Sequence, residues 1–274
     1  MVLTRAERQF TDDLDLSIQQ FVEAWRLMCA GAPGFAGTMI DGMECIFSGG
    51  PIAFFNVAVL TSRNVAANAL ASYAKGARAW ASSKAVPWLF VVTHEALEPG
   101  IDAAAVLDVC GMAPMMPMTG MVAHTIRPAT GAAAGLQLTL AQDDSACSAI
   151  LDVNGLAYGM DLDAGKDLIG TRAFWIGHFP VLGLTDGKPA CCAAVMMVDG
   201  YRYVALVATD PGQQRRGYAE AAMRRALELS AEVHGECRTV LHASDAGRPI
   251  YARMGYTPIS THTIFMEKAF LDAH

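Results

Sequence analysis

The chain has 274 residues, of which 53% are hydrophobic and 17% charged, and its formal net charge is −7. This composition is typical of a well-buried globular protein and excludes an intrinsically disordered chain. The acidic balance argues against nucleic acid as the main partner. No apolar run reaches the roughly 18–20 residues that span a bilayer, and residues 1–17 lack the apolar core of a signal peptide. We therefore expect a cytoplasmic protein that binds neither nucleic acid nor a membrane.

The first half of the chain contains two short apolar segments of strand length. Residues 54–61 (FFNVAVLT) and 87–93 (PWLFVVT) fit core strands, and an alanine-rich stretch of helical character lies between them. Residues 106–112 (VLDVCGM) follow and include Gly111. Residues 126–140 then predict a strand, and residues 143–159 predict a helix.

Residues 179–209 predict three antiparallel strands. The turns between them fall at Asp186-Gly187 and Asp199-Gly200, and Asp-Gly is a strong hairpin signal. A helix over 217–233, a strand over 238–244 and a helix over 246–254 follow. We expect Gly255 to be the C-cap that ends the last of these. Residues 256–268 give one or two final strands. Mixed strands around a β-α-β crossover predict an α+β fold.

The two halves share a similar order of segments. Residues 54–61 resemble 201–209, 87–93 resemble 238–244, and 106–112 resemble 250–256, which places Gly111 opposite Gly255. We interpret this similarity as an internal duplication, with domains at 1–124 and 125–274; two unrelated α/β domains are the alternative. The N-terminal copy lacks the glycine that follows the strand in the other copy, and Leu107 occupies the position of Tyr251.

The segment 207–230 (VATDPGQQRRGYAEAAMRRALELS) predicts a strand end, a turn and the start of a helix. The free N–H groups of the first helical turn, two arginines and Gly217 together favour an anion site. A Walker loop and a dinucleotide G-x-G-x-x-G are both absent. The seven cysteines contain no C-x-x-C pair, which favours buried or free thiols over disulfides or a metal site, and we expect no metal.

Gln214-Arg215-Arg216-Gly217-Tyr218-Ala219 resembles the Gln/Arg-x-x-Gly-x-Gly/Ala loop of the GNAT (N-acetyltransferase) superfamily, which holds the pyrophosphate of acetyl-coenzyme A. The segment 243–256 (ASDAGRPIYARMGY) resembles a later helix of that family. The resemblance is specific over about 195–268 and only topological over 35–125. It implies two tandem GNAT-like domains, each with a mixed, mostly antiparallel sheet flanked by helices, of which the N-terminal one is degenerate.

The resemblance also implies a set of coenzyme-binding residues. The backbone of Val207, Ala208 and Thr209 would pair with the pantetheine arm, and Ser244 takes a position where the family usually has asparagine. The pyrophosphate would be surrounded by Arg215, Arg216, Gly217, Tyr218, Ala219 and Glu220. For each arginine side chain, a solvated helix face is an equal alternative to a phosphate contact.

Tyr251 resembles the general acid of the family, which protonates the departing thiolate; a core aromatic residue is the alternative. A tyrosine with a pKa near 10 suits that task. Neither 201–209 nor 238–244 contains a carboxylate that could act as a general base. His178, His242 and a chain of water molecules remain open, and no base is assigned.

The resulting hypothesis is an N-acetyltransferase that transfers the acetyl group of acetyl-coenzyme A directly to a primary amine. The acceptor is a small molecule or a peptide amine, and a homodimer is left open. The alternatives are a non-catalytic acyl-coenzyme A sensor and a transferase for longer acyl chains.

Overall fold

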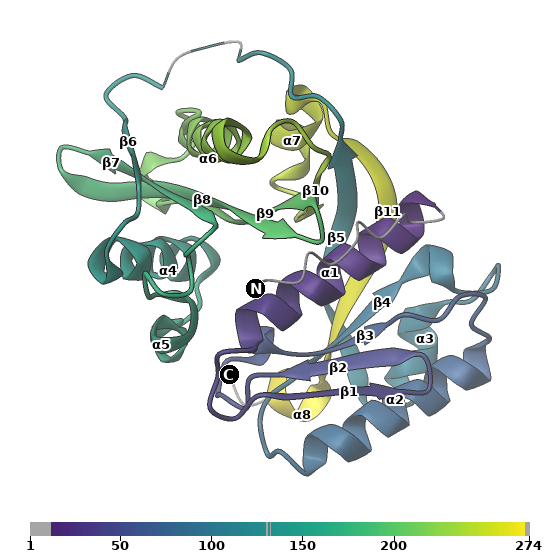
Figure 1. Cartoon of the computed structure of the whole chain (residues 1–274). Helices are drawn as coiled ribbons and strands as arrows, with labels where there is room; N and C mark the ends of the chain where they lie inside the picture. Colours follow the sequence, from purple (N-terminus) through teal and green to yellow (C-terminus); the bar gives the residue numbers. More distant parts are fainter. Residues whose placement is uncertain (1–11, 130, 132, 272–274) are drawn as a thin grey trace, which may run out of the picture. The chain divides into compact units, whose positions relative to one another are not determined.

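The structure, a computed structural model, describes residues 12–129, 131 and 133–271 (Figure 1). Their contacts divide these residues into two compact units. The C-terminal unit consists of Val122–Leu241 and Pro249–Thr257; the N-terminal unit consists of 12–121, His242–Arg248 and 258–271. The N-terminal unit therefore includes the last strand of the chain, so the units do not follow a single cut in the sequence. The division into domains at 124/125 stays a prediction.

The C-terminal unit is built on a five-stranded arrangement. Its strands follow the order β10 (Thr239–Ala243), β9 (Tyr201–Thr209), β8 (Lys188–Val198), β7 (Phe179–Thr185) and β6 (Gln137–Leu140). β10 and β9 are parallel, and the other neighbours are antiparallel. The predicted three-stranded meander is confirmed. Both residues of each Asp-Gly turn have positive φ, as a two-residue type I′ hairpin requires.

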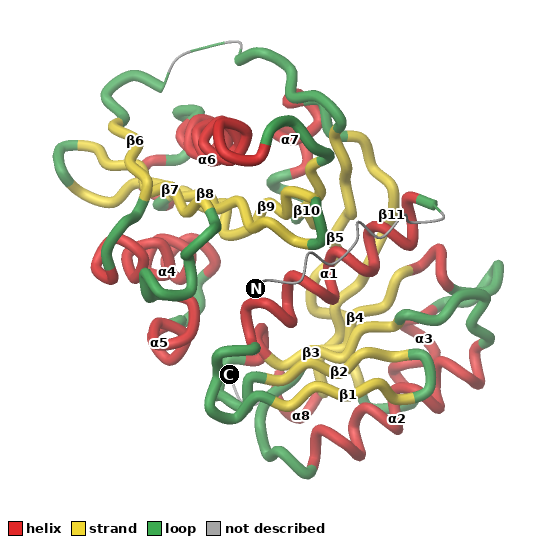
Figure 2. Tube along the Cα trace, viewed as in Figure 1, coloured by secondary structure: helices red, strands yellow, loops and turns green. Residues whose placement is uncertain are grey.

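Helices lie on both faces of these strands. Figures 1 and 2 show α4 (Asp144–Tyr158) and α5 (Lys166–Ile169) on one face, and α6 (Tyr218–His234) and α7 (Arg248–Met254) on the other. Two short 3-10 turns are also present, η3 (Asp163–Gly165) and η4 (Pro211–Gln213). α6 forms because its apolar residues recur at helical spacing. That stripe is buried and comprises Ala222, Met223, Ala226 and Leu227; the buried Ser230 extends it, with its hydroxyl donating to the Leu227 carbonyl.

The N-terminal unit contains the other strands. In order across the sheet they are β1 (Ala36–Ile40), β2 (Met43–Phe47), β3 (Asn56–Leu60), β4 (Leu89–Thr93), β11 (Thr257–Glu267) and β5 (Met112–Ala123). β3 and β4 are parallel, whereas β11 pairs antiparallel with β4, from His262↔Thr93 to Met266↔Leu89. The last strand of the chain thus completes the sheet that the first half begins.

The helices of the N-terminal unit are α1 (Asp13–Cys29), α2 (Ala67–Ser82), α3 (Ala103–Asp108) and α8 (Lys268–Leu271), with 3-10 turns η1 (Ala53–Phe55) and η2 (His94–Ala96). Side chains alternate across a strand, so Met43, Cys45 and Phe47 of β2 enter one core. That core also contains the apolar stripe of α2, formed by Leu70, Ala74, Ala77 and Ala81.

Both units contain the same β-α-β connection. β3, α2 and β4 form a parallel pair with its helix, and so do β9, α6 and β10. A short helix follows each pair, and Gly111 and Gly255 come after these helices with φ of 75° and 104°. The predicted α+β class is confirmed, and the similarity predicted between the halves corresponds to a shared topology.

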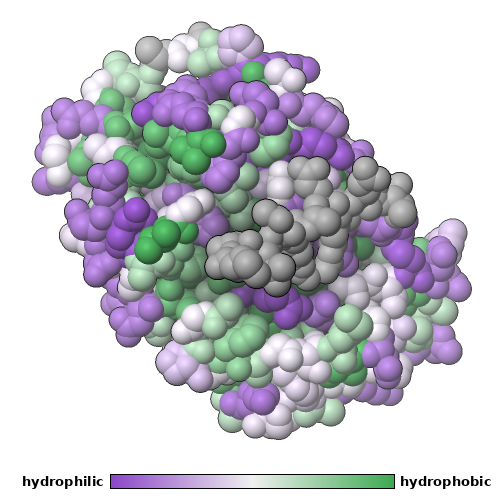
Figure 3. Space-filling view, in the orientation of Figure 1, coloured by the Kyte–Doolittle hydropathy of each residue, from purple (hydrophilic) through white to green (hydrophobic). Residues whose placement is uncertain are grey.

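On the face seen in Figure 3, hydrophilic and hydrophobic residues are interspersed over the C-terminal unit, as expected of a surface in contact with water. Among the described residues, no helix combines the length and apolar character that crossing a membrane would require. The same residues contain no cluster of three or more histidine, cysteine or acidic side chains arranged to hold a metal ion.

Candidate functional site

β9 contains a bulge within the segment predicted to hold the pantetheine arm. The register with β8 shifts between Cys192↔Ala208 and Ala194↔Ala205, so two residues of β9, Leu206 and Val207, lie opposite Ala193. Leu206 has a φ of 53°, which is rare for a bulky residue without a structural reason. A bulge bends the strand and removes backbone groups from the regular ladder. It thereby makes them available to a ligand.

The carbonyl groups of the bulge are held by side chains from α4 and β8. The carbonyl of Leu206 accepts hydrogen bonds from Asn154 Nδ2 at 3.3 Å and from the thiol of Cys192 at 3.2 Å. The carbonyl of Val207 accepts a bond from the Tyr158 hydroxyl at 3.2 Å. Sequence reasoning missed Asn154 and Tyr158. The only signal was an asparagine and a tyrosine four positions apart in the predicted helix, a spacing that places both on one side of it.

The ladder between β9 and β10 is short. Its pairs run from Thr239↔Arg202 to Leu241↔Val204 and end there. The stretch Ala205–Thr209, which includes the bulge, therefore lies beyond the paired part of the two strands. This local separation is what the predicted pantetheine site requires, because an extended ligand can pair only with backbone groups that no strand occupies.

The turn after β9 contains two left-handed residues. Asp210 accepts a hydrogen bond from the N–H of Gly212 at 2.7 Å and so begins η4. Arg215 and Gly217 follow with φ of 63° and 77°. A Cβ placed on Gly217 would have no heavy atom within 4 Å. The glycine therefore satisfies a left-handed backbone and faces open space.

Gly217 is also the N-cap of α6, and it has no side chain to cap the helix. The first intrahelical bond runs from the N–H of Ala221 to the carbonyl of Gly217 at 3.0 Å. The N–H groups of Tyr218, Ala219 and Glu220 precede that bond and have no partner within the helix. Tyr218 itself is buried, and its hydroxyl donates to the carbonyl of Ala134 at 3.2 Å, so its side chain is structural.

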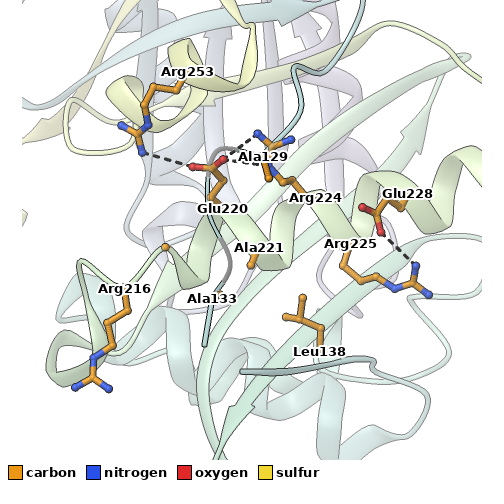
Figure 4. Close-up of a pocket in the computed structure, with 12 residues that line it drawn as sticks. Ala129, Ala133, Leu138, Arg216, Glu220, Ala221, Arg224, Arg225, Glu228 and Arg253 are labelled. Carbon is orange, nitrogen blue, oxygen red and sulfur yellow. Dashed lines mark hydrogen bonds and ion pairs between the residues drawn. The ribbon is translucent and has the colours of Figure 1, made fainter. Parts of the chain in front are cut away.

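A pocket of about 410 Å³ lies along the outer face of α6, next to Gly217 (Figure 4). Small and apolar residues, among them Leu138 and Ala221, form part of its wall. The charged residues that line it are Arg216, Glu220, Arg224, Arg225, Glu228 and Arg253. Four arginines against two glutamates make the pocket positive in a chain whose net charge is −7.

Glu220 is held between two arginines in this pocket. Its carboxylate lies 2.8 Å from Nη2 of Arg224 and 3.5 Å from Nη2 of Arg253 (Figure 4). Arg225 pairs with Glu228 at 3.3 Å. Arg216 differs from the other three: across the residues that the structure describes, it has no carboxylate partner. Its guanidinium is therefore available to an anion at the N-terminus of α6.

Tyr251 lies on α7 and is buried, with 8% of its surface exposed. Burial raises the pKa of its hydroxyl well above 10, and the neighbouring hydroxyls of Tyr158 and Tyr256 add to this effect. The hydroxyl makes no hydrogen bond to any described residue, so its proton is not committed elsewhere. A neutral, uncommitted phenol can donate a proton.

Ser244 lies in the turn that leads into α7. Its hydroxyl accepts from the N–H of Gly247 at 3.4 Å, and its carbonyl accepts from the N–H groups of Gly247 and Arg248, both at 3.0 Å. By its contacts Ser244 belongs to the N-terminal unit. The turn at 210–217 belongs to the C-terminal unit, and the coenzyme contact of Ser244 stays a prediction.

The two histidines considered as bases are both used by the fold. His178 Nδ1 accepts a bond from the N–H of Met197 at 3.2 Å, and burial lowers the pKa of its ring. His242 Nε2 lies 3.0 Å from Ser17 Oγ in a buried network of the N-terminal unit. The network continues through Ser260 and His262 to Thr93. No base is assigned.

Residues 180–270 match the family model of the acetyltransferase (GNAT) domain. This part of the chain is a GNAT domain. The predicted recognition is thereby confirmed for the region in which the two motifs lie. A search of curated proteins found no match to the sequence.

Solved structures show that the GNAT fold extends over most of the chain. A GCN5-related N-acetyltransferase from Kribbella flavida is 20% identical, with a TM-score of 0.65 over 92% of this chain and 95% of that one. A tandem GNAT protein from the clavulanic acid biosynthesis pathway is 14% identical, with a TM-score of 0.53 over 93% and 95%. At these identities the similarity shows the fold alone. The expected tandem arrangement is confirmed at that level.

Proposed function

We propose that the GNAT domain binds acetyl-coenzyme A at the end of β9 and transfers its acetyl group to a primary amine. One observation carries the proposal: a strand bulge is followed by an uncapped helix N-terminus, and Gly217 leaves the approach to that helix open. Arg216 adds an uncommitted positive charge at the same place. The oxygens of a pyrophosphate are suited to such a site.

In the proposed binding mode, the pantetheine amides pair with the backbone of Val207, Ala208 and Thr209. The pyrophosphate accepts from the N–H groups of Tyr218, Ala219 and Glu220 and contacts the segment that begins at Arg215. The positive pocket on α6 leaves room for the nucleotide end of the coenzyme. Tyr158 does not block this mode, since a carbonyl has two lone pairs and that of Val207 can accept a second bond.

The proposed reaction is a direct transfer without a covalent intermediate on the protein. The amine nitrogen attacks the thioester carbonyl carbon, a backbone N–H of β9 stabilises the oxyanion, and the C–S bond breaks. Tyr251 gives its proton to the departing sulfur, and water takes the proton that the amine loses. The amide and free coenzyme A are the products. Such a reaction needs no metal.

A non-catalytic acyl-coenzyme A sensor is the second candidate function. It is favoured by the observation that His178 and His242 both make hydrogen bonds within the fold. Under this proposal the coenzyme binds as described, and no transfer follows. A small-molecule amine and a peptide amine remain the two acceptor classes to compare, together with longer acyl chains. Action in the cytoplasm, alone or as a homodimer, stays part of the proposal.

A thermal-shift measurement with acetyl-coenzyme A, together with a coenzyme-release assay, tests the proposal. Ligand at one hundred times its Kd should stabilise the protein by about 2.7 kcal/mol. Release of coenzyme should rise with one member of a panel of amines, amino acids and aminoglycoside antibiotics. A shift without turnover would favour the sensor, and the absence of any shift would rule out both candidates.

A further inference from the structure

The backbone at the β9 bulge is positioned from outside the strand. Asn154 lies one helical turn before Tyr158 on α4, so both side chains emerge on the same side of the helix. Asn154 is 3% exposed, and its Nδ2 also contacts the carbonyl of Ile150 at 2.9 Å and the sulfur of Cys192 at 3.1 Å. A side chain tied at several points has little rotational freedom. It can therefore fix the Leu206 carbonyl that it contacts.

Fixing that carbonyl also fixes a hydrogen-bond donor. The carbonyl of Leu206 and the N–H of Val207 belong to one planar trans peptide, so they point in opposite directions. Asn154 and Cys192 hold the carbonyl on their side. The N–H of Val207 must then point away from both of them. The bulge, in which Leu206 has a φ of 53°, is the backbone conformation that turns the Leu206 carbonyl toward Asn154 and Cys192 and the Val207 N–H away from them.

Tyr158 fixes the next peptide in the same way. Its hydroxyl donates to the Val207 carbonyl at 3.2 Å, while about half of the residue's surface is exposed. The surrounding protein nevertheless removes water from this hydroxyl, which raises its pKa, and Cys192 raises it further. The group therefore stays protonated and remains a donor. Two successive carbonyl groups of β9 are thus held by residues four positions apart on one helix.

We propose that Asn154 and Tyr158 are positioning residues, which hold the β9 bulge so that the Val207 N–H is aimed at the thioester carbonyl oxygen. The inference rests on the proposed function, because the oxyanion forms only if acetyl-coenzyme A binds at β9. Neither side chain touches the reacting atoms; both act through the backbone. Preorganised donors of this kind accelerate a reaction because they need no reorientation as charge develops.

The variant Tyr158→Phe tests the proposal, since a half-exposed ring that loses only its hydroxyl should still fold. Hydrolysis of acetyl-coenzyme A by water, followed chromatographically as released coenzyme, provides a readout that needs no identified acceptor. We expect the turnover at saturating coenzyme to fall roughly tenfold, as for a weakened oxyanion donor, with the Kd for coenzyme A within twofold of the wild-type value. Tyr73→Phe, which alters a tyrosine on α2 of the N-terminal unit, is the matched control and should change neither quantity.

Three outcomes would overturn the positioning role. The first is wild-type turnover in Tyr158→Phe. The second is a loss of coenzyme affinity equal to the loss of turnover, since that indicates uniform binding. The third is a pH–rate profile that loses its alkaline limb, because that would assign proton transfer to Tyr158 itself.

A second variant separates this proposal from the proposed function. Asn154→Ala removes one of the two donors to the Leu206 carbonyl, the Cys192 thiol being the other, and should lower turnover more than Tyr158→Phe does. Thermal unfolding establishes that the variant is folded. Wild-type turnover in a folded Asn154→Ala protein would overturn the role of Asn154. If the wild-type protein itself fails to bind acetyl-coenzyme A, the proposed function fails. If the wild type binds and turns over while both variants match it, only the positioning role fails.

Discussion

Val65 and Leu97 form an isolated parallel bridge in the N-terminal unit. The N–H of Val65 donates to the carbonyl of Ala96 at 3.0 Å, and its carbonyl accepts from the N–H of Glu98 at 3.1 Å. The bridge lies beyond the ladder of β3 and β4, whose pairs end at Val59↔Val91. Counted from the last pair of each ladder, Val59↔Val91 and Leu241↔Val204, Val65 corresponds to Asp210, so the bridge lies just past the stretch that corresponds to Ala205–Thr209 in the other copy. The bridge joins the two segments at the far end of the gap into which a pantetheine arm would extend, so the corresponding slot of this copy is closed at that end.

We therefore predict one acetyl-coenzyme A site per chain. Isothermal calorimetry should give a stoichiometry near one, and the Gly217→Val variant should abolish that single binding heat. Two equivalent sites in the wild-type protein would contradict the interpretation that the N-terminal copy is closed. Residual binding in Gly217→Val would place a site outside the α6 turn.

Replacement of Gly217 by valine should abolish coenzyme binding while the protein stays folded. A valine at a φ of 77° costs about 1–2 kcal/mol in backbone strain, and its side chain would fill the open space in front of α6. Gly187→Val is the matched control. Gly187 has a φ of 73° and equally open surroundings, but lies in the hairpin between β7 and β8. We expect the two variants to lose the same amount of stability, and only Gly217→Val to lose coenzyme binding. If Gly217→Val and Gly187→Val bind the coenzyme equally well, the loop assignment is refuted.

Neutralising Glu220 should strengthen coenzyme binding. Its carboxylate lies in the first turn of α6, where a negative charge opposes an incoming phosphate. Glu220→Gln keeps the shape and the contact with Arg224, and a charge at this position is worth roughly two- to fivefold in affinity. Glu228→Gln, two turns further along the helix, should have a smaller effect. Calorimetry at low salt compares the two; weaker binding in Glu220→Gln would mean that orienting Arg224 and Arg253 outweighs the charge.

Local signals made much of the C-terminal unit predictable from the sequence. The Asp-Gly turns at 186–187 and 199–200 set the hairpins, and the predicted helix over 217–233 corresponds to α6, preceded by Gly217. These features depend on residues close together in the chain. The helix that carries Tyr251 was predicted for the same reason.

Features that depend on distant contacts were not predictable. α1 was missed because its first turn is charged, although its later residues Phe21, Val22 and Trp25 are buried. The pairing of β11 with β4 joins segments about 170 positions apart, and no local pattern encodes it. The bulge was missed because leucine has no preference for positive φ. Leu206 adopts that conformation where Asn154 and Cys192 bind its carbonyl.

The buried network of the N-terminal unit should make the fold sensitive to acid. His262 contacts Thr93, Ser260 and Ser17, and burial lowers the pKa of its ring to about 4; Glu95 opposes this shift and His94 reinforces it. Burial also lowers the pKa of His242, and His262 lowers it further.

Since these rings are neutral in the fold, the unfolded chain binds more protons below pH 6.5. Stability should fall as the pH drops from 6.5 to about 4, by roughly 3 kcal/mol for His262 alone. Chemical denaturation at a series of pH values measures this slope, and His262→Gln should flatten it. An unchanged slope in that variant would show that another group controls acid unfolding.

Tyr251 distinguishes an enzyme from a sensor, and Tyr256 provides the comparison. Both tyrosines are buried, with ring centroids 6.1 Å apart, but the Tyr256 hydroxyl is bound to Thr239 Oγ1 at 2.6 Å, whereas that of Tyr251 has no described partner. Tyr256→Phe should therefore lower the free energy of unfolding by about 1 kcal/mol and leave turnover per folded molecule intact.

Tyr251→Phe should do the reverse. We expect unchanged stability and coenzyme affinity, with turnover reduced on the order of 10²–10⁴-fold, since the departing thiolate loses its proton donor. Because burial keeps the Tyr251 hydroxyl protonated, wild-type turnover should show no decline from its ionisation up to pH 10. Stopped assays with the acceptor found in the amine panel measure both variants. If Tyr251→Phe turns over at the wild-type rate, Tyr251 has no part in the mechanism. If the wild type and every variant fail to turn over, the sensor is left as the function.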